Sequence, residues 1–353
     1  DSVLWIGPLF LAQWMEGIRA NLALSPRPPL IRFLPLATWL AAAIVVLPWL
    51  IFSVIYFGSP FPNTVFAKTV AYVVEPGSAF TTLFARYANP FFETLTVGAT
   101  GALILALLYL VLALTAMIYA ARRAPRLLPL LIYPWLYLAV FSLANPLIFR
   151  WYVVPPLPGL MLGIAAGAWV WIERLQKAVP RRRAIIPVAV GALAALWIVM
   201  SLRAWTLHPD QGAPQPAPLT AWNQIELDYE GVANTLRDQF GVTPDTVVAS
   251  ADIGTIGYFT RARIIDTVGL VTPALSKYYP FPPEILVKAP DPQNYAIPPR
   301  LILDTQPDYL VTMEAFVRLG LEKDAAFKAE YGDPVVTVPT DFYGTDMRAY
   351  KRR

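Results

Sequence analysis

The stretch LATWLAAAIVVLPWLIFSVIYF, residues 36–57, contains 22 consecutive residues and no charged side chain. A helix that crosses a lipid bilayer needs about 20 predominantly apolar residues, so this stretch predicts a transmembrane helix. Four similar stretches follow, and a shorter one, with Gln13 and Glu16, precedes them; the additional stretches are residues 2–18, 96–121, 127–149, 152–172 and 184–204. The sequence therefore predicts a polytopic α-helical membrane protein with about six transmembrane helices.

The composition supports this class. Hydrophobic residues make up 56% of the chain and charged residues 15%, whereas soluble domains contain about 25% charged residues. Residues 1–205 contain five acidic and fifteen basic side chains, a net charge of +10, and residues 206–353 contain nineteen and thirteen, a net charge of −6, which sums to the +4 of the whole chain. The basic residues flank apolar segments, so the charge does not indicate a nucleic-acid partner.

The residue inventory excludes several kinds of site. The chain has no cysteine and one histidine, His208, so it offers no disulfide, no thiolate metal site and no histidine-based metal site or triad. We identify no cofactor, and the presence of a divalent metal stays open. The sequence opens on Asp1 without a readable signal peptide, and we expect the chain to be the C-terminal part of a longer protein.

The basic residues between the apolar stretches predict a membrane orientation. If the six segments cross the membrane in alternating directions, eleven basic residues lie on one side of it: Arg19, Arg27, Arg32, Arg122, Arg123, Arg126, Arg174, Lys177, Arg181, Arg182 and Arg183. Only four face the other side: Lys68, Arg86, Arg150 and Arg203. Because cytoplasmic loops are enriched in Lys and Arg, this asymmetry predicts a multi-pass protein of the cell membrane whose residues after 205 are extracytoplasmic.

The periodicity changes after the last apolar stretch. We expect a transmembrane domain over residues 1–205, a Pro-rich linker over 206–220 and an extracytoplasmic α/β domain over 221–353. In this last domain, residues 225–240 and 314–332 are expected to be helices, and 246–250, 262–268, 308–312 and 335–340 strands.

The segment FGSPFPNTVFAK, residues 57–68, directly follows the first long apolar stretch. Its prolines stiffen the exit from the membrane, and Asn63 and Thr64 are expected to cap a short helix that carries Lys68. Lys68 is either an interfacial anchor or, next to a helix N-terminus, part of a phosphate site.

A second segment, FRWYVVPPLPG at residues 149–159, places Arg150 beside interfacial aromatic residues. Arginine anchors helices at the interface and also binds phosphate through two parallel hydrogen bonds. By the predicted topology Arg150 shares a membrane face with Lys68 and Arg86, and three converging cations would neutralise a diphosphate or phosphodiester head group.

The C-terminal domain contains one patterned stretch, DIGTIGYFTRARIIDTV at residues 252–268. DIGTIG lacks the first glycine of a dinucleotide-binding loop, so we expect its glycines to form turns that pack Tyr258 and Phe259. Asp252 and Asp266 are more plausibly turn or capping residues than acid–base groups.

Taken together, GSPFPNTVFAK, FRWYVVPPLPG and DIGTIGYFTRARIIDTVGLVTP resemble the bacterial GT-C glycosyltransferases, and especially arabinosyltransferase-like and protein O-mannosyltransferase-like members. These polytopic enzymes use polyprenyl-phosphate sugars. The resemblance implies that Arg150 and Tyr152, with Trp151 inserted between them, match an R-Y-x-x-P stretch at the lipid-phosphate end of the active cavity. It also implies that Lys68, with Asn63 and Thr64, lines that cavity.

The resemblance implies transfer of a sugar from a polyprenyl phosphate to an extracytoplasmic glycan, lipid or protein, with inversion at the anomeric carbon. The family's catalytic acid lies in an early extracytoplasmic loop that has no counterpart here, so no catalytic residue is named. Two alternatives stay open: a non-catalytic membrane protein with an extracytoplasmic binding domain, and a transporter. The strong apolar stretches contain no acidic residue at mid-depth, which disfavours the transporter.

Overall fold

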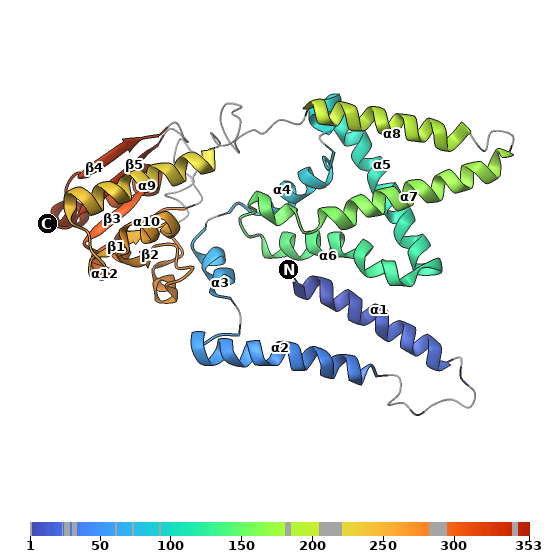
Figure 1. The fold of residues 1–353 in the computed structure, drawn as a ribbon, viewed down its shortest axis with the longest axis horizontal. Helices are drawn as coiled ribbons and strands as arrows, with labels where there is room; N and C mark the ends of the chain where they lie inside the picture. The colour runs from blue at the N-terminus through green and yellow to red at the C-terminus, as the bar shows by residue number, and fades with distance from the viewer. Residues whose placement is uncertain are drawn as a thin grey trace. The chain divides into compact units, whose positions relative to one another are not determined.

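The computed structural model describes residues 2–22, 24, 29, 34–60, 62–72, 74–91, 93–180, 185–204, 221–281, 295–340 and 345–353. The chain forms two compact units, and the chain crosses between them more than once (Figure 1). The helical unit consists of Asp1–Tyr56 and Pro76–Trp205, and the α/β unit consists of Phe57–Glu75 and Thr206–Arg353. The linear division at residue 205 predicted from the sequence therefore misses one segment, because residues 57–75 join the C-terminal unit.

The helical unit follows the apolar stretches of the sequence. Its helices are α1 (Ser2–Leu22), α2 (Leu36–Phe57), α4 (Ser78–Tyr87), α5 (Glu93–Arg123), α6 (Leu128–Ala144), α7 (Leu157–Ala178) and α8 (Ile185–Ala204). Within the described residues, four spans have the length and apolar character to cross a membrane: Leu36–Phe57, Glu93–Arg123, Pro125–Ala144 and Ile185–Leu202. The chain is thus mostly helical, with four candidate membrane helices.

Large apolar side chains on these helices point outward. Ile55 on α2 is 80% exposed and Val188 on α8 is 71% exposed. A surface of this kind is unfavourable in water but matches hydrocarbon, where the helix satisfies its own backbone hydrogen bonds. The exposure pattern is the one expected of lipid-facing helices.

Helix α7 packs against α5 and α6 through three glycines spaced four residues apart. Gly159, Gly163 and Gly167 are buried, and a Cβ atom added at Gly167 would overlap the backbone carbonyl of Leu112 on α5. Small residues at this spacing let helix backbones approach closely, as they do in membrane bundles. The same glycines lower the apolar character of α7 relative to its neighbours.

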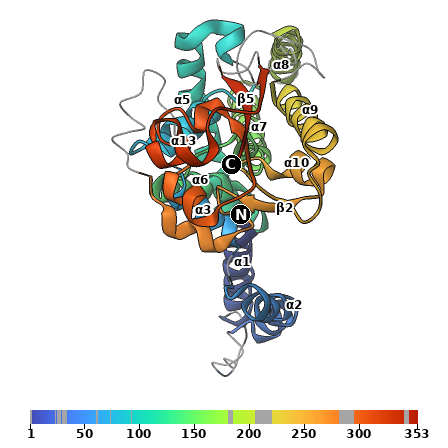
Figure 2. The same cartoon turned by 90° about the vertical axis from the view of Figure 1, so that its left-hand side faces the viewer.

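The α/β unit is built on a five-stranded sheet in the order β2-β1-β3-β5-β4; Figure 2 labels two of these strands, β2 and β5. The strands are β1 (Val247–Ser250), β2 (Arg263–Asp266), β3 (Tyr309–Met313), β4 (Val336–Pro339) and β5 (Asp346–Lys351). β1 pairs in parallel with β2 and β3, whereas β5 pairs antiparallel with β3 and β4. Four strands were predicted from the sequence; β5 was missed.

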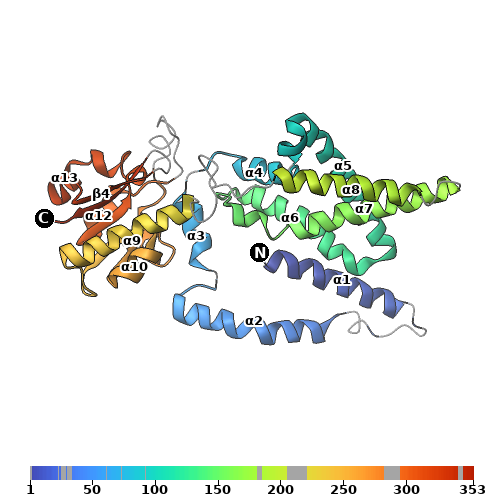
Figure 3. The same cartoon turned by 45° about the horizontal axis from the view of Figure 1, so that its top comes forward.

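Helices cover both faces of this sheet (Figure 3). α9 (Ala221–Phe240) and α10 (Ile253–Thr260) pack in one cluster with Val248, Tyr309 and Val311, and the opposite cluster joins Ala249 and Leu310 to α12 (Pro299–Thr305) and α13 (Ala325–Tyr331). Neighbouring strand residues alternate between the two clusters, as the pleat requires.

Two local expectations fail in this unit. Residues 314–332 do not form one helix but the 3₁₀ turns Glu314–Phe316 and Leu321–Lys323 followed by α13, because Asp324 accepts a 2.9 Å bond from the Phe327 amide and starts a new helix. The DIGTIG glycines do not form turns either: Gly254 and Gly257 lie within α10, and Gly257 lets that helix approach Ile264 of β2 closely.

Candidate functional site

The segment after α2 is anchored in the α/β unit by Asn63. Helix α3 (Asn63–Val70) has Pro62 as its N-cap and no side-chain capping bond, so the prediction that Asn63 and Thr64 cap it is wrong. The Asn63 side-chain amide instead donates hydrogen bonds to the carbonyl of Gly269 and, at 2.9 Å, to that of Leu270. The Asn63 side chain thus bonds to carbonyl groups distant in the sequence and does not cap the amides of its own helix.

The other end of α3 is anchored by apolar contacts. Ala71 is completely buried in the core that contains Leu301 and Leu310, and the Tyr72 ring lies 5.6 Å from that of Tyr295. The Tyr295 hydroxyl is in turn 2.9 Å from Thr267 Oγ1. Residues 63–72 are therefore a structural part of the α/β unit.

Lys68 lies between these two anchors, in the last turn of α3, and is half-buried. Thr64 lies in the first turn and is exposed. A short helix fixed at both ends holds the lysine backbone in one orientation relative to the sheet.

The other predicted phosphate-binding residues belong to the helical unit. Arg86 is exposed in the last turn of α4, and Arg150 begins the 3₁₀ segment Arg150–Val153 that includes Tyr152; the side chain of Arg150 lies outside the described residues. The two elements meet, since Leu83 of α4 and Val153 share one apolar cluster with Tyr133 and Tyr137 of α6. The structure thus brings the Arg86 and Tyr152 segments together.

The same unit buries one carboxylate that the sequence did not single out. Glu93 at the start of α5 accepts a 2.7 Å bond from the Tyr109 hydroxyl and a 3.0 Å bond from the Phe91 amide. Five residues later, Gly98 has a φ of 75° and kinks α5. Glu93 therefore fixes the helix start beside this kink.

Two aspartates follow parallel strands of the α/β unit. Asp266 ends β2 and accepts bonds from the amides of Val268 (3.0 Å) and Val271 (2.8 Å), which confirms its turn role. Asp252 makes no capping bond and instead accepts a 2.9 Å bond from the Tyr229 hydroxyl. Burial raises the pKa of both carboxyl groups, and these hydrogen bonds oppose the rise.

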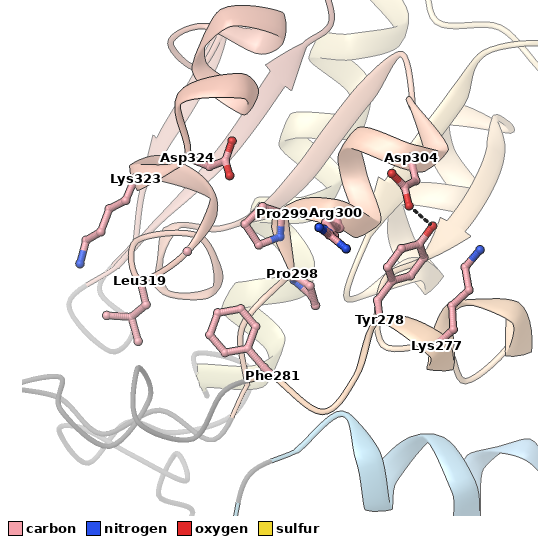
Figure 4. A pocket seen from close by; sticks show the side chains of 11 residues that line it. Lys277, Tyr278, Phe281, Pro298, Pro299, Arg300, Asp304, Leu319, Lys323 and Asp324 are labelled. Atoms are coloured by element: carbon pink, nitrogen blue, oxygen red, sulfur yellow. Dashed lines mark hydrogen bonds between the residues drawn. The ribbon is translucent and has the colours of Figure 1, made fainter.

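A hollow of about 790 Å³ lies on the α/β unit (Figure 4). Lys277, Arg300 and Lys323 bring three cations to it, and none has a salt bridge to another residue that the structure describes. Asp304 and Asp324 also line it, but Asp304 accepts a 3.0 Å bond from Tyr278 and Asp324 caps α13. In a domain of net negative charge, this hollow favours an anionic ligand.

Over the residues described here, no group of three His, Asp or Glu side chains has the arrangement of a metal site. The hollow was not predicted, because its residues come from three separate segments (277–281, 298–304 and 319–324) and no local motif marks them.

The comparisons with known proteins concern the C-terminal part of the chain. A family model described as a domain of unknown function, DUF8728, matches residues 219–349. The match covers α9 to β5 but not residues 57–75, which complete the same unit in this chain. A search of curated proteins finds no match.

Proposed function

We propose that this protein is an integral-membrane glycosyltransferase that moves a sugar from a polyprenyl phosphate to an extracytoplasmic acceptor. The observation that carries the proposal is the integration of α3, with Lys68, into the α/β unit. Lys68 lies only eleven residues after Phe57, the last residue of α2. A cation of the folded α/β unit is therefore tethered by a short segment to the end of a candidate membrane helix.

The membrane topology in this proposal is six crossings with the α/β unit outside the cytoplasm. Residues 57–75 and 206–353 share one core and therefore one side of the membrane. An even number of crossings must lie between them. Three of the candidate spans lie there, those of α5, α6 and α8, so α7, 22 residues long and packed on α5 through Gly167, supplies the fourth.

The absence of cysteine from the chain makes this topology directly testable. Single substitutions Thr64→Cys, Arg123→Cys, Lys177→Cys and Lys351→Cys, at exposed positions, are treated in intact cells with a membrane-impermeant maleimide. We expect labelling at positions 64 and 351 and protection at 123 and 177. Labelling at 177 or protection at 351 contradicts the proposed topology.

The proposed chemistry is a displacement at the anomeric carbon. The acceptor oxygen forms the new bond to that carbon, the bond to the phosphate oxygen breaks with its electron pair, and the acceptor proton passes to the carboxylate that the resemblance implies in an early extracytoplasmic loop. Negative charge grows on the departing phosphate, and Lys68, Arg150 and Arg86 are the cations proposed to stabilise it, with Tyr152 proposed as a further phosphate-binding residue. Inversion and the polyprenyl carrier rest on the resemblance to GT-C enzymes.

The test is transfer by the full-length enzyme, including the early extracytoplasmic loop that is expected to supply the catalytic acid, in liposomes that contain polyprenyl-phosphate hexoses or pentoses. Lys68→Ala and Arg150→Ala are expected to lower transfer by roughly tenfold or more each, because each removes a charge-assisted contact. Arg123→Ala, on the side proposed to face the cytoplasm, is the matched control. Equal rates for all three variants contradict the assignment.

The cation-lined hollow favours a second candidate, a non-catalytic membrane protein whose extracytoplasmic domain binds an anionic ligand. This candidate predicts ligand binding that survives Lys68→Ala and Arg150→Ala, together with no sugar transfer by the wild type.

A further inference from the structure

Tyr137 on α6 is a buried tyrosine whose hydroxyl has no hydrogen-bond partner among the described residues. The residue is 0% exposed. Two other polar side-chain atoms of the described membrane helices share this state, Ser142 Oγ and Trp197 Nε1, but both residues are half-exposed. Tyr137 is therefore distinctive in combining complete burial with an unsatisfied hydroxyl.

Two other tyrosines of the helical unit have hydrogen-bond partners for their hydroxyl groups. The Tyr87 hydroxyl donates a 2.7 Å bond to the Pro134 carbonyl, and the Tyr109 hydroxyl donates to Glu93. A buried hydroxyl without a partner costs free energy, and phenylalanine would fill the same space without that cost. A partner that the described residues do not supply accounts for the tyrosine.

The position of Tyr137 indicates which partner. Its ring stacks on Phe141 with centroids 4.2 Å apart, and Phe141 contacts Tyr152 at 5.6 Å. Tyr137 also shares its cluster with Leu83, one turn before Arg86, and with Val153, three residues after Arg150. Tyr137 thus packs in one cluster with both segments that carry cations of the proposed phosphate site in the helical unit.

We propose that the Tyr137 hydroxyl donates a hydrogen bond to a phosphate oxygen of a lipid phosphate, which enters when the Leu83–Val153 cluster opens. The inference rests on the proposed function and adds a residue to its donor-binding site. A phenol stays protonated at neutral pH and is a donor to an anion. The surrounding apolar side chains favour a phosphate attached to a hydrocarbon chain over a free one, because they match the chain and not water.

The test is binding of undecaprenyl phosphate to the purified full-length chain, wild type and Tyr137→Phe, in detergent. The substitution removes only the hydroxyl. We expect about tenfold weaker binding, the size of one charge-assisted hydrogen bond, with an unchanged or higher melting temperature. Tyr119→Phe on the exposed face of α5 is the matched control, with unchanged binding expected.

Parallel titrations with dioleoyl phosphatidic acid and inorganic phosphate separate the sources of the phosphate. Weakening by Tyr137→Phe for either lipid phosphate supports the proposal, whereas weakening for inorganic phosphate alone overturns it. Equal binding by the two proteins, or a lower melting temperature of the variant without a change in binding, also overturns it. If the wild type binds lipid phosphate through Tyr137 but transfers no sugar, the glycosyltransferase proposal fails while this one stands.

Discussion

The side-chain amide of Asn63 donates a 2.9 Å hydrogen bond to the carbonyl of Leu270, a residue 207 positions further along the chain. This bond and its companion to Gly269 hold the segment after α2 on the loop that follows β2. The α/β unit is therefore assembled from two parts of the sequence separated by five α-helices of the helical unit, α4 to α8.

Asn63→Ala is expected to destabilise the α/β unit by about 1–2 kcal/mol, because it leaves two partly buried carbonyls without their donor. The measurement is the rate of limited proteolysis of that unit in the full chain, with exposed Thr64→Ala as control. Equal proteolysis of the two variants contradicts the anchoring role of Asn63.

Gly167→Ala is expected to destabilise the helical unit by about 1–3 kcal/mol, since the added methyl group overlaps the Leu112 carbonyl and forces α5 and α7 apart. Gly163→Ala is the matched control, because its added Cβ would lie 3.6 Å from the nearest atom, the Ala113 Cβ, which is an ordinary contact. Melting temperatures of the purified proteins in detergent compare the two. A larger loss at 163 than at 167 contradicts the close approach.

Asp252→Asn is expected to make the stability of the α/β unit less dependent on pH. Burial raises the folded-state pKa of Asp252, so the folded state binds more protons than the unfolded state between the ordinary aspartate pKa and the raised value. The free energy of unfolding of the wild type therefore falls as the pH rises through that window and increases again as the pH falls.

The asparagine retains an acceptor for the Tyr229 hydroxyl without this titration. The variant should accordingly gain stability over the wild type at neutral pH, and the gain should shrink in acid. Chemical denaturation at pH 7 and in acid measures the difference, and a gain that grows as the pH falls contradicts the assigned sign.

Arg300→Glu is expected to weaken binding of an acidic oligosaccharide such as oligogalacturonate by about tenfold, because it reverses one of the three positive charges at the hollow. Lys328→Glu, an exposed site on α13 outside the hollow, makes the same change in net charge and serves as control. Isothermal titration at two salt concentrations checks both variants. Equal weakening of the two indicates general electrostatic attraction and not this site.

Much of the fold could be predicted because its causes are local. The uncharged run at residues 36–57 is α2 to the residue, since a membrane-length apolar segment has few alternatives to a helix. β5 was missed because Arg348 breaks its apolar pattern, although Arg348 is paired with Asp346 and Glu322 in the structure. The single helix expected at 314–332 does not form, because Asp324 caps a new helix in the middle of the segment whose apolar residues recur with helical spacing.

The site was less accessible to prediction because its causes are distant in sequence. Asn63 was assigned to the nearest helix end, which is the best local use of an asparagine, whereas its acceptors lie beyond position 260. The Tyr137 hydroxyl carries no sequence signal, since a tyrosine in an apolar run looks the same with or without a partner. Lys68 and Arg150 could be selected only because cations are rare on the predicted outer side.

The placement of α3 has a consequence for biosynthesis. A ribosome adding roughly 5–20 residues per second needs roughly 10–40 seconds to extend the chain from Asn63 to its acceptor Gly269, 206 residues later. During that interval Ala71 and Tyr72 have no core to enter, and the intervening membrane helices must be made first. In the proposed topology, a chain with one crossing too few would leave α3 and its acceptors on opposite sides of the bilayer, so the α/β unit could be completed only after the preceding helices had crossed the membrane an even number of times.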